Sequence, residues 1–113
     1  MHELAITQSM LDLVLKQAEE AGAKEVRRIN LVIGGMTGVV EECVQFYFKF
    51  LGQGTIAEEA VLAFTKVPTA ARCQSCGKHF EVEEFAWACP HCGGNSLQIV
   101  AGKELFVESI EVE

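Results

Sequence analysis

The order of apolar and polar residues near the start of the chain has the period of a helix. From about residue 5 to residue 21, apolar side chains recur every three or four positions, which predicts an amphipathic helix. The side chains that define its apolar stripe are Ile6, Met10, Leu13, Val14 and Ala21, and the stripe is broadened by Leu4, Leu11, Leu15 and Ala18. Gly22 suits the end of this helix. Ser9 and Asp12 have the spacing of a capping box, so a start near residue 9 is an alternative.

The remaining apolar pattern predicts one more helix and three strands. Residues 26–33 alternate apolar and polar side chains as a strand does, and 61–67 is a second short apolar run. Between them, residues 40–51 return to the helical period, and the glycine-rich stretch 34–38 predicts a turn. The apolar face of this second helix is Val44, Tyr47, Phe48 and Leu51. The third strand, 106–113, places Phe106, Ile110 and Val112 among acidic residues.

A segment of different composition separates the second and third strands. Residues 68–103 contain four cysteines, two histidines and the only tryptophan, which indicates an insertion between two strands. We therefore predict an α+β fold in two lobes, one of residues 1–67 and 104–113 and the other of residues 68–103. Phe85 and Trp87 are the expected small core of the insertion, and the acidic run 81–84 is an expected solvated face.

Composition and charge exclude several classes of function. Half of the residues are hydrophobic and only two are proline, which argues against disorder. No apolar run approaches the ~20 residues of a membrane span, and no stretch resembles a signal peptide, so we expect a cytoplasmic protein without a membrane partner. The formal net charge of −7 repels phosphate backbones, so we expect no nucleic-acid partner.

Four of the five cysteines fall in two CxxC pairs. Cys73 and Cys76 form the first pair and Cys89 and Cys92 the second, with 12 residues between the pairs and a glycine after each. Two such turns supply the four tetrahedral thiolates that zinc prefers. Iron is an alternative metal for the same sulfurs, and a disulfide or a redox dithiol is an alternative to a metal.

The predicted zinc is expected to have a structural role. A lobe of about 36 residues is too small to be stable by burial alone, and zinc binding contributes about 10–16 kcal/mol to such folds. A closed shell of four sulfurs leaves no open position for a substrate, which argues against zinc catalysis. The lobe carries three basic and three acidic side chains, so a nucleic-acid-binding ribbon is not expected.

The chain opens with Met1, His2 and Glu3, whose donor atoms suit a square-planar metal. The Met1 amine, the His2 backbone nitrogen and the His2 imidazole Nδ1 close five- and six-membered rings on one ion. The Glu3 amide or carboxylate is a candidate fourth donor. A deprotonated backbone nitrogen requires a metal such as nickel(II) or copper(II) rather than zinc. From the spacing alone, the simpler interpretation is that His2 is a surface histidine without a function.

Several motifs, taken in order along the whole chain, make it similar to a known family. MHELAI opens the chain, IGGMTGVVEE spans residues 33–42, GTIAE spans 54–58, the CxxC pairs lie in an insertion near the C-terminus, and SIEVE closes the chain. This combination resembles the HypA family, including its HybF-type paralogues, which are nickel metallochaperones for NiFe-hydrogenase maturation.

The resemblance implies a fold, a site and an activity. The implied fold is a small mixed three-stranded sheet with two helices, plus an inserted lobe like a zinc ribbon. Nickel(II) is implied at His2, with the Met1 amine and the backbone nitrogens of His2 and Glu3 beside it, and zinc(II) at the four paired cysteines. The implied activity is carriage of nickel rather than catalysis, and the sequence holds no nucleophile–base arrangement or phosphate loop.

The resemblance also implies partners. Family members work with a HypB-type GTPase and deliver nickel to the hydrogenase large subunit, and in some organisms the same pathway feeds urease. A monomer and a homodimer are both compatible with the sequence. Two positions depart from the family pattern, since relatives often carry an acid where Gly35 stands and an aspartate near Val40. Glu41 is a candidate substitute for the second.

Three further residues have simple expected roles. Cys43 is expected to be a buried, inert thiol. His79 and His91 are expected to be solvated loop residues, with transient metal binding near the zinc as the alternative. The competing function for the whole chain is a zinc-ribbon adaptor that only recognises proteins, in which case His2 has no metal to bind.

Overall fold

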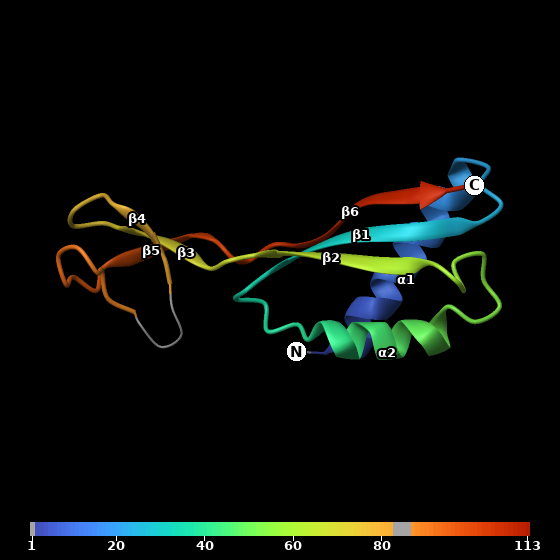
Figure 1. Ribbon diagram of the computed structural model, residues 1–113, viewed down its shortest axis with the longest axis horizontal. Coiled ribbons are helices and arrows are strands. Elements are labelled where there is room, and N and C mark those ends of the chain that lie inside the picture. The colour runs from blue at the N-terminus through green and yellow to red at the C-terminus, as the bar shows by residue number, and fades with distance from the viewer. Residues whose placement is uncertain (1, 83–86) are drawn as a thin grey trace. The chain divides into compact units, whose positions relative to one another are not determined.

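The computed structural model describes residues 2–82 and 87–113 and has the predicted α+β class (Figure 1). Every helix and strand expected from the apolar pattern is present, and three short strands are added within the insertion. In chain order the elements are α1 (Glu3–Glu20), β1 (Val26–Gly34), α2 (Glu41–Leu51), β2 (Val61–Val67), β3 (Ala70–Cys73), β4 (His79–Glu81), β5 (Leu97–Ala101) and β6 (Leu105–Val112).

The chain divides into two compact units. The first unit comprises Met1–Val32, Gly38–Thr65 and Phe106–Glu113, and the second comprises Ile33–Thr37 and Lys66–Leu105. Strands β1, β2 and β6 each begin in one unit and end in the other. Neither helix in the described part of the chain is both long and apolar enough to cross a membrane.

A three-stranded mixed sheet with the order β2-β1-β6 runs through the first unit. Strands β1 and β2 run in the same direction, with α2 connecting them, and β6 runs the opposite way (Figure 1). Hydrogen bonds near the ends of the strands agree with these directions. The Val26 amide donates to the Ile56 carbonyl over 2.9 Å, and the Glu113 amide donates to the Glu25 carbonyl over 2.9 Å. The mixed three-stranded sheet expected from the resemblance is confirmed.

Helix α1 begins and ends at positions set by specific contacts. It begins at Glu3 with His2 as the N-cap, so the alternative start near Ser9 is wrong. At its C-terminal end the Ala23 amide donates to the Ala18 carbonyl, and Gly22 has a φ of 67°. This is the Schellman arrangement, which glycine favours because it lacks a Cβ.

The buried stripe of α1 differs in part from the predicted one. The buried residues are Thr7, Met10, Leu11, Val14 and Ala18. Leu13 is 44% exposed, and Ala21 is also exposed, so their predicted place in the stripe is wrong. Because the helix carries leucines on either side of the stripe, the apolar period alone did not decide which of them faces the core.

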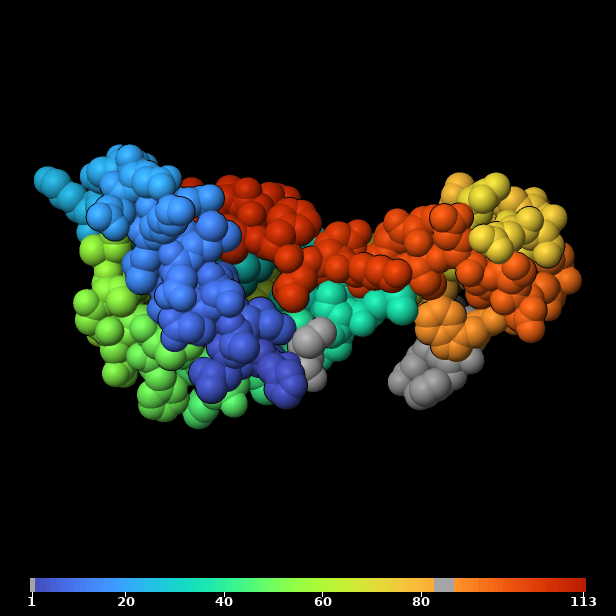
Figure 2. Space-filling model, turned by 180° about the vertical axis from the view of Figure 1, so that it is seen from behind, coloured from blue at the N-terminus to red at the C-terminus, as the bar shows by residue number. Residues whose placement is uncertain are grey.

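The core of the first unit lies between the helices and the sheet. Helix α1 packs against α2, and Figure 2 shows the blue surface of α1 beside the green surface of α2 and the segment that follows it. Val44 and Phe48 are buried, as predicted for α2. The buried members of the core are Met10, Leu11, Val14, Ala18, Val26, Ile29, Leu31, Val44, Phe48, Ala57 and Leu62.

Strand β6 presents different side chains to the core than its alternation suggests. Val107 and Ile110 pack against the core, whereas Phe106 and Val112 are 49% and 41% exposed. Of the three apolar residues that alternate with acids in the sequence, only Ile110 therefore packs against the core. Two inward residues three positions apart do not follow the two-residue period of a regular strand, so alternation misassigns this strand.

The second unit contains a small antiparallel sheet with the order β4-β3-β5. In the central strand, Ala71 lies opposite Phe80 on one side and Ile99 on the other. Trp87 is 49% exposed, so its predicted role as a core residue is wrong. Phe85 and the end of the acidic run 81–84 lie outside the described residues.

Gly34 lies so close to the loop between β5 and β6 that a side chain does not fit. A Cβ on Gly34 would lie 2.1 Å from the Gly102 carbonyl oxygen, which is backbone and has no freedom to rotate away. We expect Gly34→Ala to lower the free energy of unfolding by about 3 kcal/mol or more, the upper end of the cost of overpacking, because the neighbouring backbone cannot move aside. Urea denaturation measures this loss.

Gly54→Ala is the matched control, because Gly54 has a φ of 78° but nothing within 4 Å of an added Cβ. That substitution carries only the backbone strain, about 1–2 kcal/mol. An equal or smaller loss for Gly34→Ala would contradict the close approach.

Candidate metal centre

Two matching turns carry the four paired cysteines. In the first, the Gly77 amide donates to the Cys73 carbonyl over 2.8 Å, and in the second the Gly93 amide donates to the Cys89 carbonyl over 2.8 Å. The two glycines have φ values of 77° and 75°, a region that residues with a Cβ rarely adopt. Each turn thus directs both sulfurs of its CxxC pair to the same side of the backbone.

The structure brings all four sulfurs together. The Sγ atoms of Cys73, Cys76, Cys89 and Cys92 all lie within 4.8 Å of one another, and this is the one such group of metal-ligand side chains in the part of the chain described. Cys73 Sγ lies 3.6 Å from Cys92 Sγ, and Cys76 Sγ lies 3.6 Å from Cys89 Sγ.

These separations match those of sulfurs around one tetrahedral ion. Four thiolates at about 2.3 Å from zinc are about 3.8 Å from each other, whereas a disulfide bond is about 2.05 Å long. All the cysteines are free thiols. The donor set therefore fits a four-coordinate thiophilic metal, and the disulfide alternative does not describe this arrangement.

Backbone amides favour the charged form of some of these thiols. The Cys76 amide lowers the pKa of the Cys73 thiol to about 6. Burial raises the pKa of the Cys89 thiol, but the Cys92 amide helps to bring it below its ordinary value. The Gly94 amide acts to lower the pKa of Cys92, yet hydrogen bonds with neighbouring sulfurs raise it to about 11. Four anions this close repel one another unless a cation lies between them.

Hydrogen bonds outside the turns hold the two pairs in place. The Cys73 amide donates to the Lys78 carbonyl, and the Cys89 amide donates to the Gly94 carbonyl. Next to Cys73, the Gln74 amide donates to the Ser96 carbonyl, and the Ser96 hydroxyl donates to the Gln74 side chain over 2.8 Å. These bonds connect the first turn to the start of β5.

The histidines and the fifth cysteine lie outside the sulfur group. His91 is exposed, and its backbone amide donates to Cys89 Sγ over 3.4 Å. His79 is also exposed but begins strand β4 rather than lying in a loop. Cys43 is partly buried in α2, in the other unit. None of these residues belongs to the group of four sulfurs.

The predicted nickel residues lie at the start of α1. His2 is exposed, and its carbonyl accepts a hydrogen bond from the Ile6 amide over 3.2 Å. Glu3 is half-buried, and its carboxylate Oε2 accepts a hydrogen bond from the Val40 amide over 3.1 Å. That bond lowers the pKa of Glu3. Met1 lies outside the described residues.

The contact between Glu3 and Val40 brings together two segments that lie far apart in the sequence. Val40 is the N-cap of α2, and Glu41 is the first residue of that helix. Nothing in the spacing of these residues indicates the contact, because 37 positions separate Glu3 from Val40. The one available signal was the family pattern, which pointed to the region of position 40.

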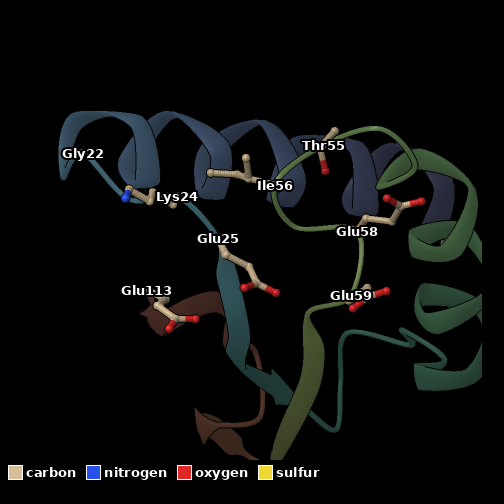
Figure 3. Close-up of a pocket in the computed structure, with 8 residues that line it drawn as sticks. All are labelled: Gly22, Lys24, Glu25, Thr55, Ile56, Glu58, Glu59 and Glu113. Carbon is tan, nitrogen blue, oxygen red and sulfur yellow. The ribbon is translucent and has the colours of Figure 1, made fainter.

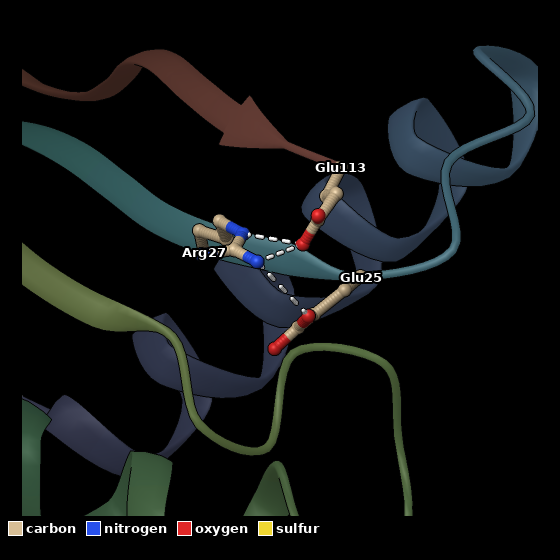
Figure 4. A network of polar contacts seen from close by, with 3 residues as sticks. All are labelled: Glu25, Arg27 and Glu113. Carbon is tan, nitrogen blue, oxygen red and sulfur yellow. Dashed lines mark hydrogen bonds and ion pairs between the residues drawn. The ribbon is translucent and has the colours of Figure 1, made fainter.

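An acidic cavity of about 670 Å³ in the first unit was also not predicted (Figure 3). Its lining residues come from the loop between α1 and β1, the segment before β2 and the C-terminus; they are Gly22, Lys24, Glu25, Thr55, Ile56, Glu58, Glu59 and Glu113. Beside the cavity, Arg27 forms an ion pair with Glu113, and its guanidinium nitrogen lies 3.9 Å from a carboxylate oxygen of Glu25 (Figure 4). Exposed ion pairs of this kind add little stability.

Comparison with known proteins identifies the family of this chain. A family model described as hydrogenase/urease nickel incorporation, metallochaperone, hypA matches residues 1–112. The chain belongs to the HypA family. The chain is 48% identical to the hydrogenase maturation factor HypA of Dehalococcoides mccartyi (strain CBDB1) over 113 residues, which cover 100% of this chain and 95% of that relative.

Two solved structures of HypA proteins have the same fold. The solution structure of the Ni metallochaperone HypA from Helicobacter pylori is 21% identical in sequence and has a TM-score of 0.65, with 99% of this chain and 97% of that chain covered. A second HypA solution structure is 20% identical, with a TM-score of 0.73 and coverage of 100% and 97%. Both support the α+β fold of this chain, with its two helices and two small sheets.

Proposed function

We propose that this chain is a nickel carrier, not an enzyme, that supplies nickel(II) for hydrogenase maturation. The observation that carries the proposal is the match of residues 1–112 to a family of nickel-incorporation metallochaperones. In this proposal residues 1–67 and 104–113 form the nickel-binding lobe, and residues 68–103 form the zinc-binding lobe. The two metals have different tasks, since nickel is the cargo and zinc is a permanent structural ion.

Zinc(II) is the proposed resident of the four-sulfur group. Cys73, Cys76, Cys89 and Cys92 would hold it, and their separations fit its thiolate shell. When bound, zinc supplies a cross-link between the two turns and neutralises the charge of the thiolates. The backbone amides at both turns already orient the sulfurs for such an ion. A closed shell of four sulfurs also leaves no position for the nickel cargo.

Nickel(II) is proposed to bind at Met1, His2 and Glu3. The first amides of a helix have no carbonyl partner within that helix, so the backbone nitrogens of His2 and Glu3 are available to a metal. The His2 carbonyl meanwhile keeps its bond from the Ile6 amide. With the Met1 amine and the His2 imidazole Nδ1, these nitrogens form the donor set that nickel(II) favours and zinc does not.

Delivery is proposed to occur by ligand exchange inside a docked complex. His2 is exposed, so a partner's ligands can reach a metal at this end of the chain, and reprotonation of backbone nitrogen favours release. The proposed partners are a HypB-type GTPase and the hydrogenase large subunit, with urease accessory proteins in organisms that use the pathway for urease. The proposed location is the cytoplasm, with the protein as a monomer or homodimer.

The experiment that tests this proposal is a nickel titration followed by visible absorption. The protein with an unmodified Met1 is expected to form a yellow, square-planar species with one nickel per chain. His2→Ala removes the imidazole, and we expect nickel affinity to fall by more than about 100-fold. Mutation of a residue that only hydrogen-bonds to a metal ligand already lowers metal affinity by about 10–100-fold. His79→Ala, which changes an exposed histidine elsewhere, is the matched control. Equal nickel binding by all three proteins would contradict the proposal.

A second candidate function is that of a protein-interaction adaptor. The observation in its favour is a pair of exposed aromatic side chains on α2, Phe46 and Phe50, which are 57% and 58% exposed and contact each other edge to face. Exposed aromatic residues are common at binding surfaces. A protein with only this function would show no square-planar nickel species in the titration above.

A further inference from the structure

The side chain of Glu3 has a partner within the protein. Its carboxylate Oε2 lies 3.1 Å from the Val40 amide nitrogen, which donates to it. Val40 is the N-cap of the 11-residue helix α2, and no side chain of its own segment caps this end. The N-terminal end of a helix carries partial positive charge, so a carboxylate is stabilised there. Glu3 thus caps α2 from the first turn of α1.

This capping contact links the proposed nickel ligands to the rest of the first unit. Helices α1 and α2 pack against each other, and Glu3 is the first residue of α1. The Thr7 hydroxyl donates to the Glu3 carbonyl over 2.6 Å, which adds a second bond at the same residue. Glu3 is therefore held through both its carbonyl and its side chain, whereas the preceding His2 side chain is exposed.

The contact also places the carboxylate in competition with nickel. Oε2 of Glu3 accepts from the Val40 amide, and a move of the carboxylate that turned Oε2 to a metal at His2 would leave that amide without this acceptor. Breaking a hydrogen bond to a charged group is costly. The Glu3 backbone nitrogen faces no such conflict, because a first-turn amide has no intrahelical partner.

We propose that the Glu3 carboxylate is a positioning group and not a nickel ligand. It keeps its hydrogen bond from the Val40 amide and holds the start of α1 against α2. The nitrogen donors of the first residues are thereby held in fixed positions for the metal. This inference rests on the proposed nickel site. It assigns Val40 a role in nickel binding through its backbone amide alone.

The test compares Glu3→Ala with Val40→Pro in the full chain with an unmodified Met1. Glu3→Ala removes the acceptor, and Val40→Pro removes the donor at a residue whose φ of −95° is near the range of proline. Each is expected to weaken nickel binding by about tenfold, the scale of one charged hydrogen bond, with the visible spectrum of bound nickel unchanged. The double variant is expected to lose no more than either single variant, because both remove the same contact.

Glu42→Ala is the matched control, since it removes an exposed acid from the same first turn of α2 without touching the contact. A changed nickel spectrum in Glu3→Ala but not in Val40→Pro would overturn the proposal, because it would make the carboxylate a ligand. Unchanged affinity in both single variants would also overturn it.

A direct measurement needs no variant. Square-planar nickel(II) is diamagnetic, so the Val40 amide resonance of the unmodified protein can be followed through a nickel titration. The amide is expected to keep its hydrogen-bonded chemical shift and its protection from exchange. A shift to an exposed position on nickel loading would show that the carboxylate has left it. Absence of any planar nickel species from the unmodified protein would instead refute the nickel site itself.

Discussion

Cys73→Ser is expected to unfold the second unit while the first unit stays folded. Among the described residues of the second unit, the buried hydrophobic side chains are Ile33, Ala71, Cys73 and Cys89. Burial of so few small groups does not offset the conformational entropy of ordering the unit. A structural zinc contributes about 10–16 kcal/mol to folds of this kind, so loss of one ligand removes most of the stabilisation.

Nuclear magnetic resonance spectra and zinc analysis of the same sample measure this effect. The resonances of residues 66–105 are expected to collapse toward random-coil values, and those of α1 and α2 to persist, because the main core cluster lies in the first unit. A strong chelator added to the unsubstituted protein should have the same result. Cys43→Ser is the control, as Cys43 is the free thiol outside the sulfur group. A second unit that stays ordered without metal would remove the structural role of zinc.

Two residues added before Met1 are expected to abolish square-planar nickel binding although no residue of the chain has changed. The addition converts the Met1 amine into an amide and moves the free amine two residues further from His2, to the third residue before it. The five-membered ring between the amine and the His2 nitrogen is then lost, and nickel(II) loses a corner of its preferred plane. We expect a loss of affinity at least as large as that of His2→Ala.

The control for this experiment is the same protein after the added residues have been removed by a protease. Visible spectra before and after cleavage compare identical chains that differ only at the N-terminus. Recovery of the yellow species after cleavage is the expected result. If the extended protein already forms that species, the free amine has no part in the site, and nickel must bind elsewhere.

The apolar pattern was sufficient for most of the secondary structure of this protein. The period of Val44, Phe48 and their neighbours gave α2 within one residue of its observed start, because burial of one helix face is a local property of the sequence. The run at 61–67 likewise matches β2. The same reasoning failed for Phe106 and Leu13, where apolar residues lie on both sides of the element and only packing decides which side is buried.

The four-sulfur group was predictable for the same local reason. A CxxC turn brings two sulfurs together within four residues, so only the pairing of two such turns depended on the fold. Trp87 shows the limit of this reasoning, because a large apolar residue in a small lobe was expected in its core and is instead 49% exposed. In the proposed zinc-bound protein the metal takes the place of that core, so the aromatic side chain is not needed inside.

The sequence by itself determined the fold class, the two helices, the three long strands, the four cysteines and, through its motifs, the family. Only the tertiary structure decided that α1 begins at Glu3, that Glu3 caps α2 at Val40, and that acids from three segments surround one cavity. The physical reason is the sequence separation between the residues that determine each feature. Periodicity and tight turns depend on residues within a few positions of one another, whereas a hydrogen bond across 37 positions depends on how two helices pack.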